Sequence, residues 1–264
     1  MLLDFHRRFA VILACTLFVA PALAQSPPTL YDTVNPFIGT AGGGNTFPGA
    51  SLPFGMVQWS PDTNHDAWYL YNDKQIQGFS LTHISGAGCP LYGDFAVLPT
   101  TSPLTSSPGG NFAPYAAEFN HDKEDAHPGY YTVTLANGIR VEITVTERAG
   151  IARFIFPEGT PARLLVNAGS SANTTGDALT KTPGTGIYGN RIELNEASFA
   201  GSVTAGGFCS QESHYTLYVA GRFNKPYKSS ALWQDETFSS DKKSAQGKHT
   251  GAWLDFGTER EVLL

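Results

Sequence analysis

The sequence is poor in charged and in sulfur-containing residues. Charged residues occupy 15% of its 264 positions, and it contains 3 Cys and 2 Met. The 17 Lys and Arg residues are scattered, and the formal net charge is −6. A nucleic-acid-binding surface is therefore not expected, because phosphate contacts need clustered basic side chains. The apolar run at residues 9–19 is too short for a membrane-spanning helix, which needs ~20 residues.

Long helices would need more Leu, Ala, Glu and Lys than the chain contains. It is rich instead in turn and strand formers, with 28 Gly, 17 Pro and 12% aromatic residues. This composition predicts a β-rich protein with many turns. A chain of 264 residues can form one large or two small domains, each with a sizeable core. We find no internal repeat.

The N-terminus has the features of an export signal. Residues 6–8 are basic, residues 9–19 are apolar, and residues 22–24 form a small-x-small cleavage site. A competing interpretation makes Cys15 a lipidated cysteine, which would leave the apolar region half formed. We expect a signal peptide over residues 1–24, a linker over residues 25–33, and an exported mature chain in the periplasm or outside the cell.

Cleavage near Ala24 would leave two cysteines, Cys89 and Cys209. In an oxidising compartment they can form a disulfide, whose long loop would stabilise the fold by about 4 kcal/mol. Two separate buried thiols are the alternative. The sequence leaves both open, because it does not give the Cα separation that decides between them.

Residues 34–94 alternate Gly, Pro, aromatic and short polar residues, and no helical apolar period persists there for two turns. This pattern predicts backbone-determined loops between short strands, here at residues 34–38 and 52–60. The glycines at 42–44 do not form a phosphate-binding loop, since neither a Lys-Ser/Thr pair nor a helix follows them. Because ordering a long loop costs conformational entropy, we expect these loops to serve a site.

Aromatic and polar side chains in this stretch are candidates for binding a ligand. Trp68 lies in an aromatic run beside Asp66, and such rings suit a sugar, which offers an apolar C–H face and a rim of hydroxyls. The alternative is that Trp68 fills the core, as we expect for Trp59. A structural role is the commoner one for a lone His such as His83. Cys89 lacks the neighbouring base and helix N-terminus that would activate its thiol.

The densest charge cluster lies at residues 121–127. Its carboxylates suit Ca²⁺, but the spaced ligands and central Gly of a calcium loop are missing. We therefore expect a solvated loop here. A second exposed connection is predicted at residues 100–110, which are rich in Thr, Ser, Pro and Gly.

From residue 129 onward the sequence has the pattern of a strand ladder. Alternating and β-branched runs are separated by turn residues, among them Asn137-Gly138, a strong hairpin signal. The regular spacing predicts an all-β antiparallel β-sandwich. Residues 257–264 begin a further strand, and since they end on an apolar face, we expect more protein to follow. The other predicted strands are residues 130–135, 139–148, 152–156, 162–168, 191–194, 198–203, 214–220 and 252–256.

Seven motifs follow one another along the mature chain: NPFIGT (35–40), TFPGA (46–50), PFGMVQ (53–58), SPDT (60–63), GFS (78–80), THISGAGC (82–89) and PGYY (128–131). Together they closely resemble the N-terminal domain of glycoside hydrolase family 92. The resemblance covers essentially all of the mature chain and implies one domain over residues 34–264, truncated at its C-terminal end. Its implied fold is an antiparallel β-sandwich of the supersandwich, galactose-mutarotase-like type, without the family's C-terminal (α/α)6 barrel.

The resemblance implies an exported, Ca²⁺-dependent, exo-acting α-mannosidase that inverts anomeric configuration and acts on mannose-containing glycans. Inversion needs a general acid and a general base set apart to admit a water. In the family these carboxylates, and most of the Ca²⁺ ligands, belong to the C-terminal domain. No catalytic or metal-binding role is therefore assigned to any Asp or Glu of this chain.

The resemblance also implies that the N-terminal domain contributes loops to the edge of the sugar pocket. Many relatives have His where Asn45 stands, so a contact of that imidazole would here be made by an amide or be lost. The substrate-binding residues expected at matching positions are Asn45, Phe47, Trp68, His83 and Asp94.

Three interpretations follow from the sequence. The chain is the N-terminal part of an exported α-mannosidase that needs the C-terminal domain for activity, or it is a stand-alone carbohydrate-binding β-sandwich without hydrolytic activity. The third is a truncated remnant that folds poorly because its apolar interface is bare.

Overall fold

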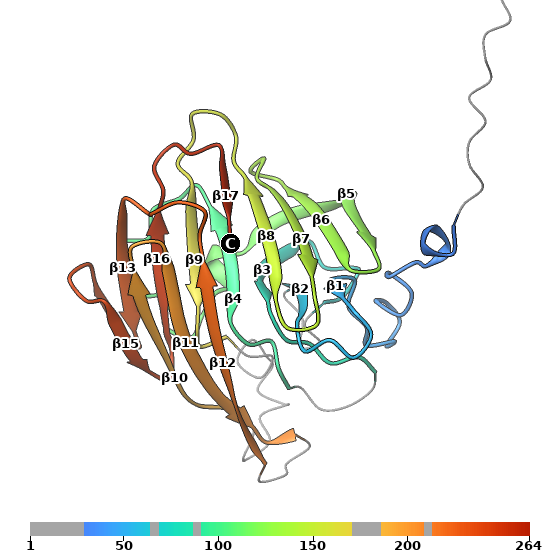
Figure 1. Ribbon diagram of the computed structural model, residues 1–264, viewed down its shortest axis with the longest axis horizontal. Coiled ribbons are helices and arrows are strands. Elements are labelled where there is room, and N and C mark those ends of the chain that lie inside the picture. The colour runs from blue at the N-terminus through green and yellow to red at the C-terminus, as the bar shows by residue number, and fades with distance from the viewer. Residues whose placement is uncertain (1–28, 64–68, 87–90, 171–185, 209–212) are drawn as a thin grey trace, which may run out of the picture.

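The computed structural model describes residues 29–63, 69–86, 91–170, 186–208 and 213–264, which are coloured in Figure 1. The predicted signal peptide and the candidate residue Trp68 lie outside these residues, as do Cys89 and Cys209.

The regular secondary structure of the described residues consists almost entirely of strands, which confirms the expected all-β antiparallel fold. Their helical content is two short 3₁₀ helices, η1 (Tyr31–Thr33) and η2 (Ala113–Tyr115). No helix in the described part of the chain has the length and apolar character needed to cross a membrane. The strands are β1 (Ala50–Ser51), β2 (Gln58–Thr63), β3 (Gln75–Ser80), β4 (Ala96–Thr100), β5 (Ala117–His127), β6 (Tyr130–Leu135), β7 (Arg140–Val145), β8 (Gly150–Ile155), β9 (Arg163–Asn167), β10 (Gly186–Asn195), β11 (Ser198–Gly206), β12 (His214–Arg222), β13 (Ser229–Gln234), β14 (Thr237–Ser239), β15 (Ser244–Gly247), β16 (Thr250–Asp255) and β17 (Glu261–Leu263).

The strands form two sheets. A 13-stranded sheet has the order β14-β13-β16-β9-β4-β3-β5-β6-β7-β8-β17, with β2 and β1 branching from β3, and a 4-stranded sheet has the order β12-β11-β10-β15. Strand β5 joins the two halves of the long sheet. Its first residues pair with β3 and its last four with β6, and the register shifts between Phe119 and Glu124.

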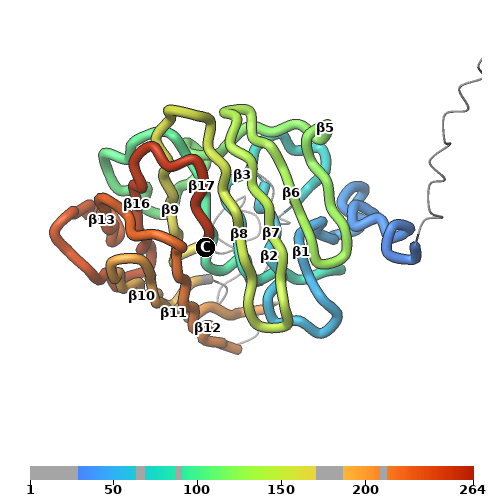
Figure 2. The backbone as a smooth tube through the Cα atoms, turned by 45° about the horizontal axis from the view of Figure 1, so that its top comes forward, coloured from blue at the N-terminus to red at the C-terminus, as the bar shows by residue number. Residues whose placement is uncertain are grey.

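The long sheet bends at β5 and packs against itself. Strands β6 and β7 contact β1 and β2 from the opposite layer, as Figure 2 also shows. On the other side of the molecule, β10 and β15 of the four-stranded sheet pack over β13 and β16 (Figure 1). The result is a double sandwich, in which every layer buries its apolar face against another strand layer.

One continuous apolar cluster fills the space between the layers. Phe95, the residue before β4, stacks on Phe199 of β11, with ring centroids 6.0 Å apart. Gly201 is required beside this pair, since a Cβ there would overlap the Phe95 ring. Trp59 is 3% exposed, as its strand pattern predicted. A smaller cluster on the outer face of the long sheet contains Leu104, so the predicted connection at residues 100–110 is anchored rather than free.

The strand ladder predicted from residue 129 onward is confirmed, because each predicted run overlaps a strand of the structure. Gly138 has φ +84° at the end of the three-residue loop 136–138 that joins β6 to β7, the left-handed conformation that the last residue of such a loop requires. Strands β13, β14 and β15 were not predicted.

Two predicted strands in the first part of the chain are wrong or misplaced. Residues 36–39 form a turn rather than a strand, because Asn35 folds the chain: its side-chain oxygen accepts the N–H of Phe37 at 2.9 Å. Of the strand predicted at 52–60, only its last three residues belong to β2. Phe54 adopts φ +60° in a turn that Gly55 closes by donating to the carbonyl of Leu52 at 2.9 Å.

The prediction of a solvated loop at residues 121–127 is also wrong, because these residues belong to β5. The side chain of Glu124 is 0% exposed there. A charged residue is almost never fully buried unless it is paired, and one partner of Glu124, Tyr69, lies 55 positions away in sequence.

Candidate functional site

The candidate site is formed by residues 39–47, 80–86 and 92–95, which we call the loop cluster. Its first loop closes on itself. Thr46 donates from its backbone N–H to the carbonyl of Gly39 at 3.3 Å, and from its hydroxyl to the carbonyl of Ile38 at 2.9 Å. Gly44 lies so close to Gly39 that a Cβ on Gly44 would overlap the Gly39 carbonyl. Gly44 is therefore needed for a compact loop.

Asn45 joins this loop to the segment that contains His83. Its backbone carbonyl accepts the N–H of Gly86 at 2.7 Å, and its side-chain amide donates to the carbonyl of Gly43 at 3.2 Å. Asn45 has φ +52°, a conformation that Asn adopts more readily than most residues. Two of the segments singled out from the sequence thus meet in the structure.

Phe47 and His83 form the second contact between these segments. Their ring centroids are 4.8 Å apart, and His83 is only 2% exposed while Phe47 is half-buried. Strand β3 ends at Ser80, so His83 lies in the loop beyond it. The imidazole therefore supports the phenyl ring from the protein side.

Hydrogen bonds fix the orientation of the His83 ring. Nδ1 lies 2.8 Å from the carbonyl oxygen of Gln58, and since a carbonyl only accepts, Nδ1 carries a proton. Nε2 lies 3.0 Å from Oδ1 of Asp62, so one further proton lies between these two groups. Burial raises the pKa of Asp62, while the hydrogen bond and charge of His83 and a hydrogen bond from Ser80 lower it.

Asp94 is fully buried in the same cluster. Its Oδ2 accepts hydrogen bonds from the hydroxyls of Thr82 at 2.9 Å and Tyr215 at 2.8 Å. Its Oδ1 is buried without a hydrogen-bond partner among the described residues. Burial raises the pKa of Asp94 to about 6, against the lowering effect of the two hydroxyls. The charge of His83 lowers the pKa of Asp94 and the charge of Asp62 raises it, so the three groups interact electrostatically.

The backbone around Asp94 is strained. Tyr92 and Phe95 have φ +68° and +56°, in the left-handed region that costs a non-glycine residue about 1 kcal/mol or more. Such conformations persist only where the surroundings impose them, and they concentrate at functional sites. The ring of Tyr92 packs on Tyr215 with centroids 5.2 Å apart. Tyr215 therefore contacts both the carboxyl of Asp94 and the strained residue Tyr92 beside it.

A second buried carboxyl, Glu124, supports the loop cluster from behind. It accepts hydrogen bonds from the hydroxyls of Tyr69 at 3.0 Å and Tyr131 at 2.7 Å, and its Oε2 lies 2.6 Å from Nδ1 of His121. Burial, followed by the nearby charge of Glu124, raises the pKa of both tyrosines well above the ordinary value. All three partners are donors, so the interior carboxylate is satisfied.

This network connects to the first loop through Tyr71. The Tyr71 ring stacks on His121, with centroids 3.9 Å apart and planes 7° apart, and its carbonyl contacts Nε2 of His121. The N–H of Tyr71 donates to the carbonyl of Thr40 at 2.9 Å. The glycine loop is therefore attached to β5 through a single short segment.

The sequence identified four of the residues placed here, Asn45, Phe47, His83 and Asp94, and missed Asp62, Gln58 and Tyr215. Asp62 lies in a recognised motif, but nothing local indicates its pairing with His83. Tyr215 lies 121 positions from Asp94. Its only signal was the strand alternation at residues 214–220.

The residues of the loop cluster do not fit a calcium site. Within the described part of the chain, no group of three or more His, Cys, Asp or Glu side chains is arranged to hold a metal ion. The free oxygen of Asp94 has the right chemistry for Ca²⁺, but a hard cation needs several such ligands. We therefore derive no step through calcium.

Comparisons with known proteins agree on one family. The model of the glycosyl hydrolase family 92 N-terminal domain matches residues 33–264. A curated relative, an uncharacterized secreted glycosidase from Arthroderma benhamiae, is 34% identical over 156 residues, which are 57% of this chain and 20% of that protein.

A family GH92 α-mannosidase from Bacteroides thetaiotaomicron has a similar structure, with a TM-score of 0.76 and 31% identity over 90% of this chain and 33% of its own. The structure of the same enzyme in complex with mannoimidazole gives a TM-score of 0.74 and 30% identity, over 88% and 31% of the two chains. The chain thus spans about a third or less of the length of these relatives. It belongs to glycosyl hydrolase family 92, of which it is an N-terminal domain.

Proposed function

We propose that this chain is the N-terminal β-sandwich domain of an exported α-mannosidase-type glycoside hydrolase and forms one wall of a cleft for mannose-containing glycans. The observation that carries the proposal is the meeting of two loops, through the hydrogen bond between Asn45 and Gly86 and the ring contact of Phe47 with His83. The mannoimidazole complex of the Bacteroides enzyme supports the choice of sugar.

The residues of the loop cluster divide into two groups by exposure. Asn45 and Phe47 are half-buried, so an amide and a phenyl ring can meet hydroxyls and C–H groups of a sugar. His83 and Asp94 are buried and positioned behind them. We assign to these two the role of positioning residues, which hold the shape of the wall without touching the glycan.

Hydrolysis with inversion needs a general acid and a general base on opposite sides of the glycosidic bond, about 6.5–9.5 Å apart. The carboxyl of Asp94 is buried and that of Asp62 is half-buried, and both are bound to neighbouring side chains, namely His83, Ser80, Thr82 and Tyr215. We therefore propose that the acid, the base and most of the calcium ligands belong to a C-terminal (α/α)6 domain, with which this domain forms the complete cleft.

The proposal is tested by titrating the ¹⁵N-labelled chain with methyl α-mannoside. The amide resonances of Asn45, Thr46 and Gly86 are expected to shift with a dissociation constant in the millimolar range, which corresponds to about −4 kcal/mol. Phe47→Ala should weaken this binding at least fivefold. The matched control is Phe238→Ala, a half-buried phenyl on β14 at the far edge of the long sheet.

Two results would count against the proposal. Unchanged binding in Phe47→Ala, or no shift of these resonances in the wild type, would remove the loop cluster as a sugar site. The chain alone, assayed with Ca²⁺, is expected to release no mannose from α-mannosides. Detectable release would show that the acid and the base lie within this chain.

A further inference from the structure

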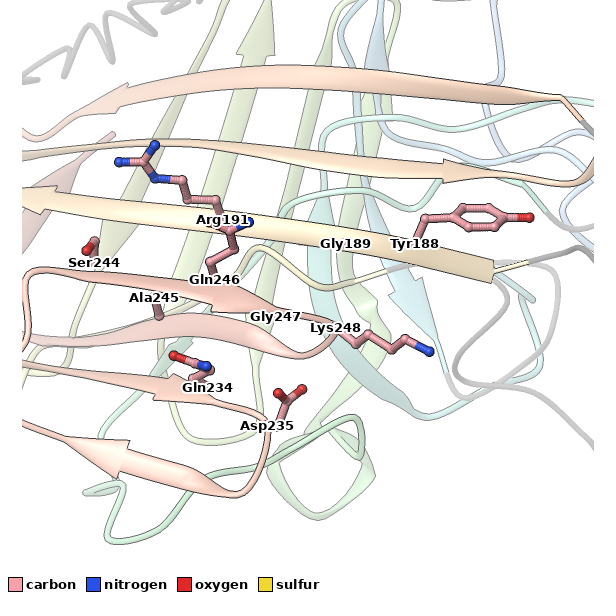
Figure 3. Close-up of a pocket in the computed structure, with 10 residues that line it drawn as sticks. All are labelled: Tyr188, Gly189, Arg191, Gln234, Asp235, Ser244, Ala245, Gln246, Gly247 and Lys248. Atoms are coloured by element: carbon pink, nitrogen blue, oxygen red, sulfur yellow. The ribbon is translucent and has the colours of Figure 1, made fainter.

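A second concave surface lies where β10 and β15 meet the turn between β13 and β14. It is an open cavity of about 1150 Å³ whose lining residues are shown in Figure 3. Pockets for single small molecules usually measure about 300–1,000 Å³. A larger and open depression suits a ligand made of several linked units.

Asp235 is held in place at one side of this cavity. It is the first residue of the two-residue turn between β13 and β14, with φ +49°. Its Oδ1 accepts the N–H of His249 at 3.1 Å, and its own N–H donates to the His249 carbonyl at 2.8 Å. Oδ2 forms no hydrogen bond with the described residues. It faces Gly247, where a Cβ would come within 2.9 Å of it.

The charges around the cavity balance. Arg191 extends from β10 and pairs with Glu193 at 2.8 Å, while Lys248 has no ion pair among the residues that the structure describes. The positive charges of Arg191 and Lys248 are thus matched by two carboxylates, those of Glu193 and Asp235. A polyanion would need a surplus of positive charge, so a neutral ligand rich in hydrogen-bonding groups fits better.

An aromatic ring completes the lining. Tyr188 is 43% exposed and lies at an irregularity of β10, where the register with β11 shifts between Ile187 and Gly189. Such bulges redirect a side chain. The ring packs against His214 with centroids 3.9 Å apart. Figure 3 shows it at the same end of the cavity as the Lys248 side chain.

We propose that this surface is a second, non-catalytic site for a neutral, mannose-containing oligosaccharide. The Tyr188 ring receives the C–H face of one sugar unit, and Asp235, Gln246 and Lys248 exchange hydrogen bonds with the hydroxyls of its neighbours. The choice of mannose rests on the proposed function, whereas the site itself rests on residues outside the loop cluster.

The test is a titration of the ¹⁵N-labelled chain with a linear α-mannotriose. Resonances of Gly189, Gly247 and Lys248 report on this surface, and those of Asn45, Thr46 and Gly86 report on the loop cluster. We expect the first set to shift, and the dissociation constant derived from it to rise at least tenfold in Tyr188→Ala and several-fold in Asp235→Asn. Asn keeps the left-handed turn. Tyr218→Ala is the matched control, a tyrosine 80% exposed on β12 outside this cavity.

The outcomes separate the two proposals. If only the loop-cluster resonances shift, or if Tyr188→Ala and Asp235→Asn bind as the wild type does, the second site is refuted and the proposed function stands. If only Gly189, Gly247 and Lys248 respond, the second site stands and the sugar wall at the loop cluster fails. If neither set responds, both proposals are overturned.

Discussion

The hydroxyl of Tyr215 donates a 2.8 Å hydrogen bond to Oδ2 of Asp94. Tyr215 lies on β12 of the four-stranded sheet, and Asp94 lies two residues before β4 of the long sheet. This contact joins the two sheets at the loop cluster. Thr82 donates the second hydrogen bond to the same oxygen.

Tyr215→Phe is expected to lower the free energy of unfolding by about 1–3 kcal/mol, because a buried carboxyl then loses one of its two hydroxyl donors. Urea unfolding followed by tryptophan fluorescence measures the change. Tyr218→Phe removes an exposed hydroxyl from the same strand and should change stability by less than about 0.5 kcal/mol. Equal effects of the two substitutions would contradict the assigned role of Tyr215.

The stability of the domain is expected to depend on pH through Asp94. Burial raises its pKa in the folded state to about 6, above the ordinary value of 3.8. Between these pH values the folded chain holds a proton that the unfolded chain has released. The contribution of Asp94 is therefore fully present below pH 3.8 and is lost as pH rises through 6, by about 3 kcal/mol at 1.36 kcal/mol per pKa unit.

Asp94→Asn tests this dependence, because the amide keeps the acceptor and has no titrating proton. Between pH 4 and pH 7.5 the free energy of unfolding of the variant, taken relative to that of the wild type, should rise by about 2.4 kcal/mol, because part of the change already lies below pH 4. Urea unfolding at several pH values gives this difference, with the exposed Asp241→Asn as a control that should stay flat. Parallel pH profiles of Asp94→Asn and wild type would rule out the raised pKa.

Glu124→Ala is expected to destabilise the domain by about 3–5 kcal/mol, because Tyr69, Tyr131 and His121 would be left around a buried site without their shared acceptor. Chemical unfolding measures the loss. Glu118→Ala removes an exposed carboxylate from the same strand and should cost less than about 0.5 kcal/mol. A loss below about 1 kcal/mol for Glu124→Ala would show that the network contributes little to stability.

Gly44→Ala should open the first loop of the loop cluster, since its Cβ would overlap the carbonyl of Gly39. We expect binding of methyl α-mannoside to weaken at least fivefold in the titration described above. The matched control is Gly42→Asn. Gly42 has φ +63°, a Cβ at this position would have no atom within 4 Å, and Asn tolerates this conformation. Wild-type affinity in Gly44→Ala would mean that the loop shape does not matter for the sugar.

Local signals in the sequence predicted most of the second half of the fold. The β6–β7 hairpin follows from Asn137-Gly138, and the strands around it follow from alternation, because both depend on residues close together in the chain. The failures have a different origin. The charges of residues 121–127 suggest a solvated loop. The carboxylate of Glu124 is nevertheless buried, because it accepts hydrogen bonds from Tyr69 and Tyr131, which lie 55 and 7 positions away.

The loop cluster combines residues that the sequence points to with residues that only the tertiary structure brings there. The resemblance to family 92 led to Asn45, Phe47, His83 and Asp94, whereas Tyr215 reaches Asp94 only through the packing of one sheet on the other. The second cavity had no sequence signal, because its lining comes from β10, β15 and the β13–β14 turn.

Strand β5 pairs with β3 at one end and with β6 at the other. Both layers of that half of the molecule are therefore one hydrogen-bonded ribbon, with no boundary at which a subdomain can detach. Thermal or chemical unfolding should consequently show a single transition, and amide exchange in β3 and β6 should slow or accelerate together.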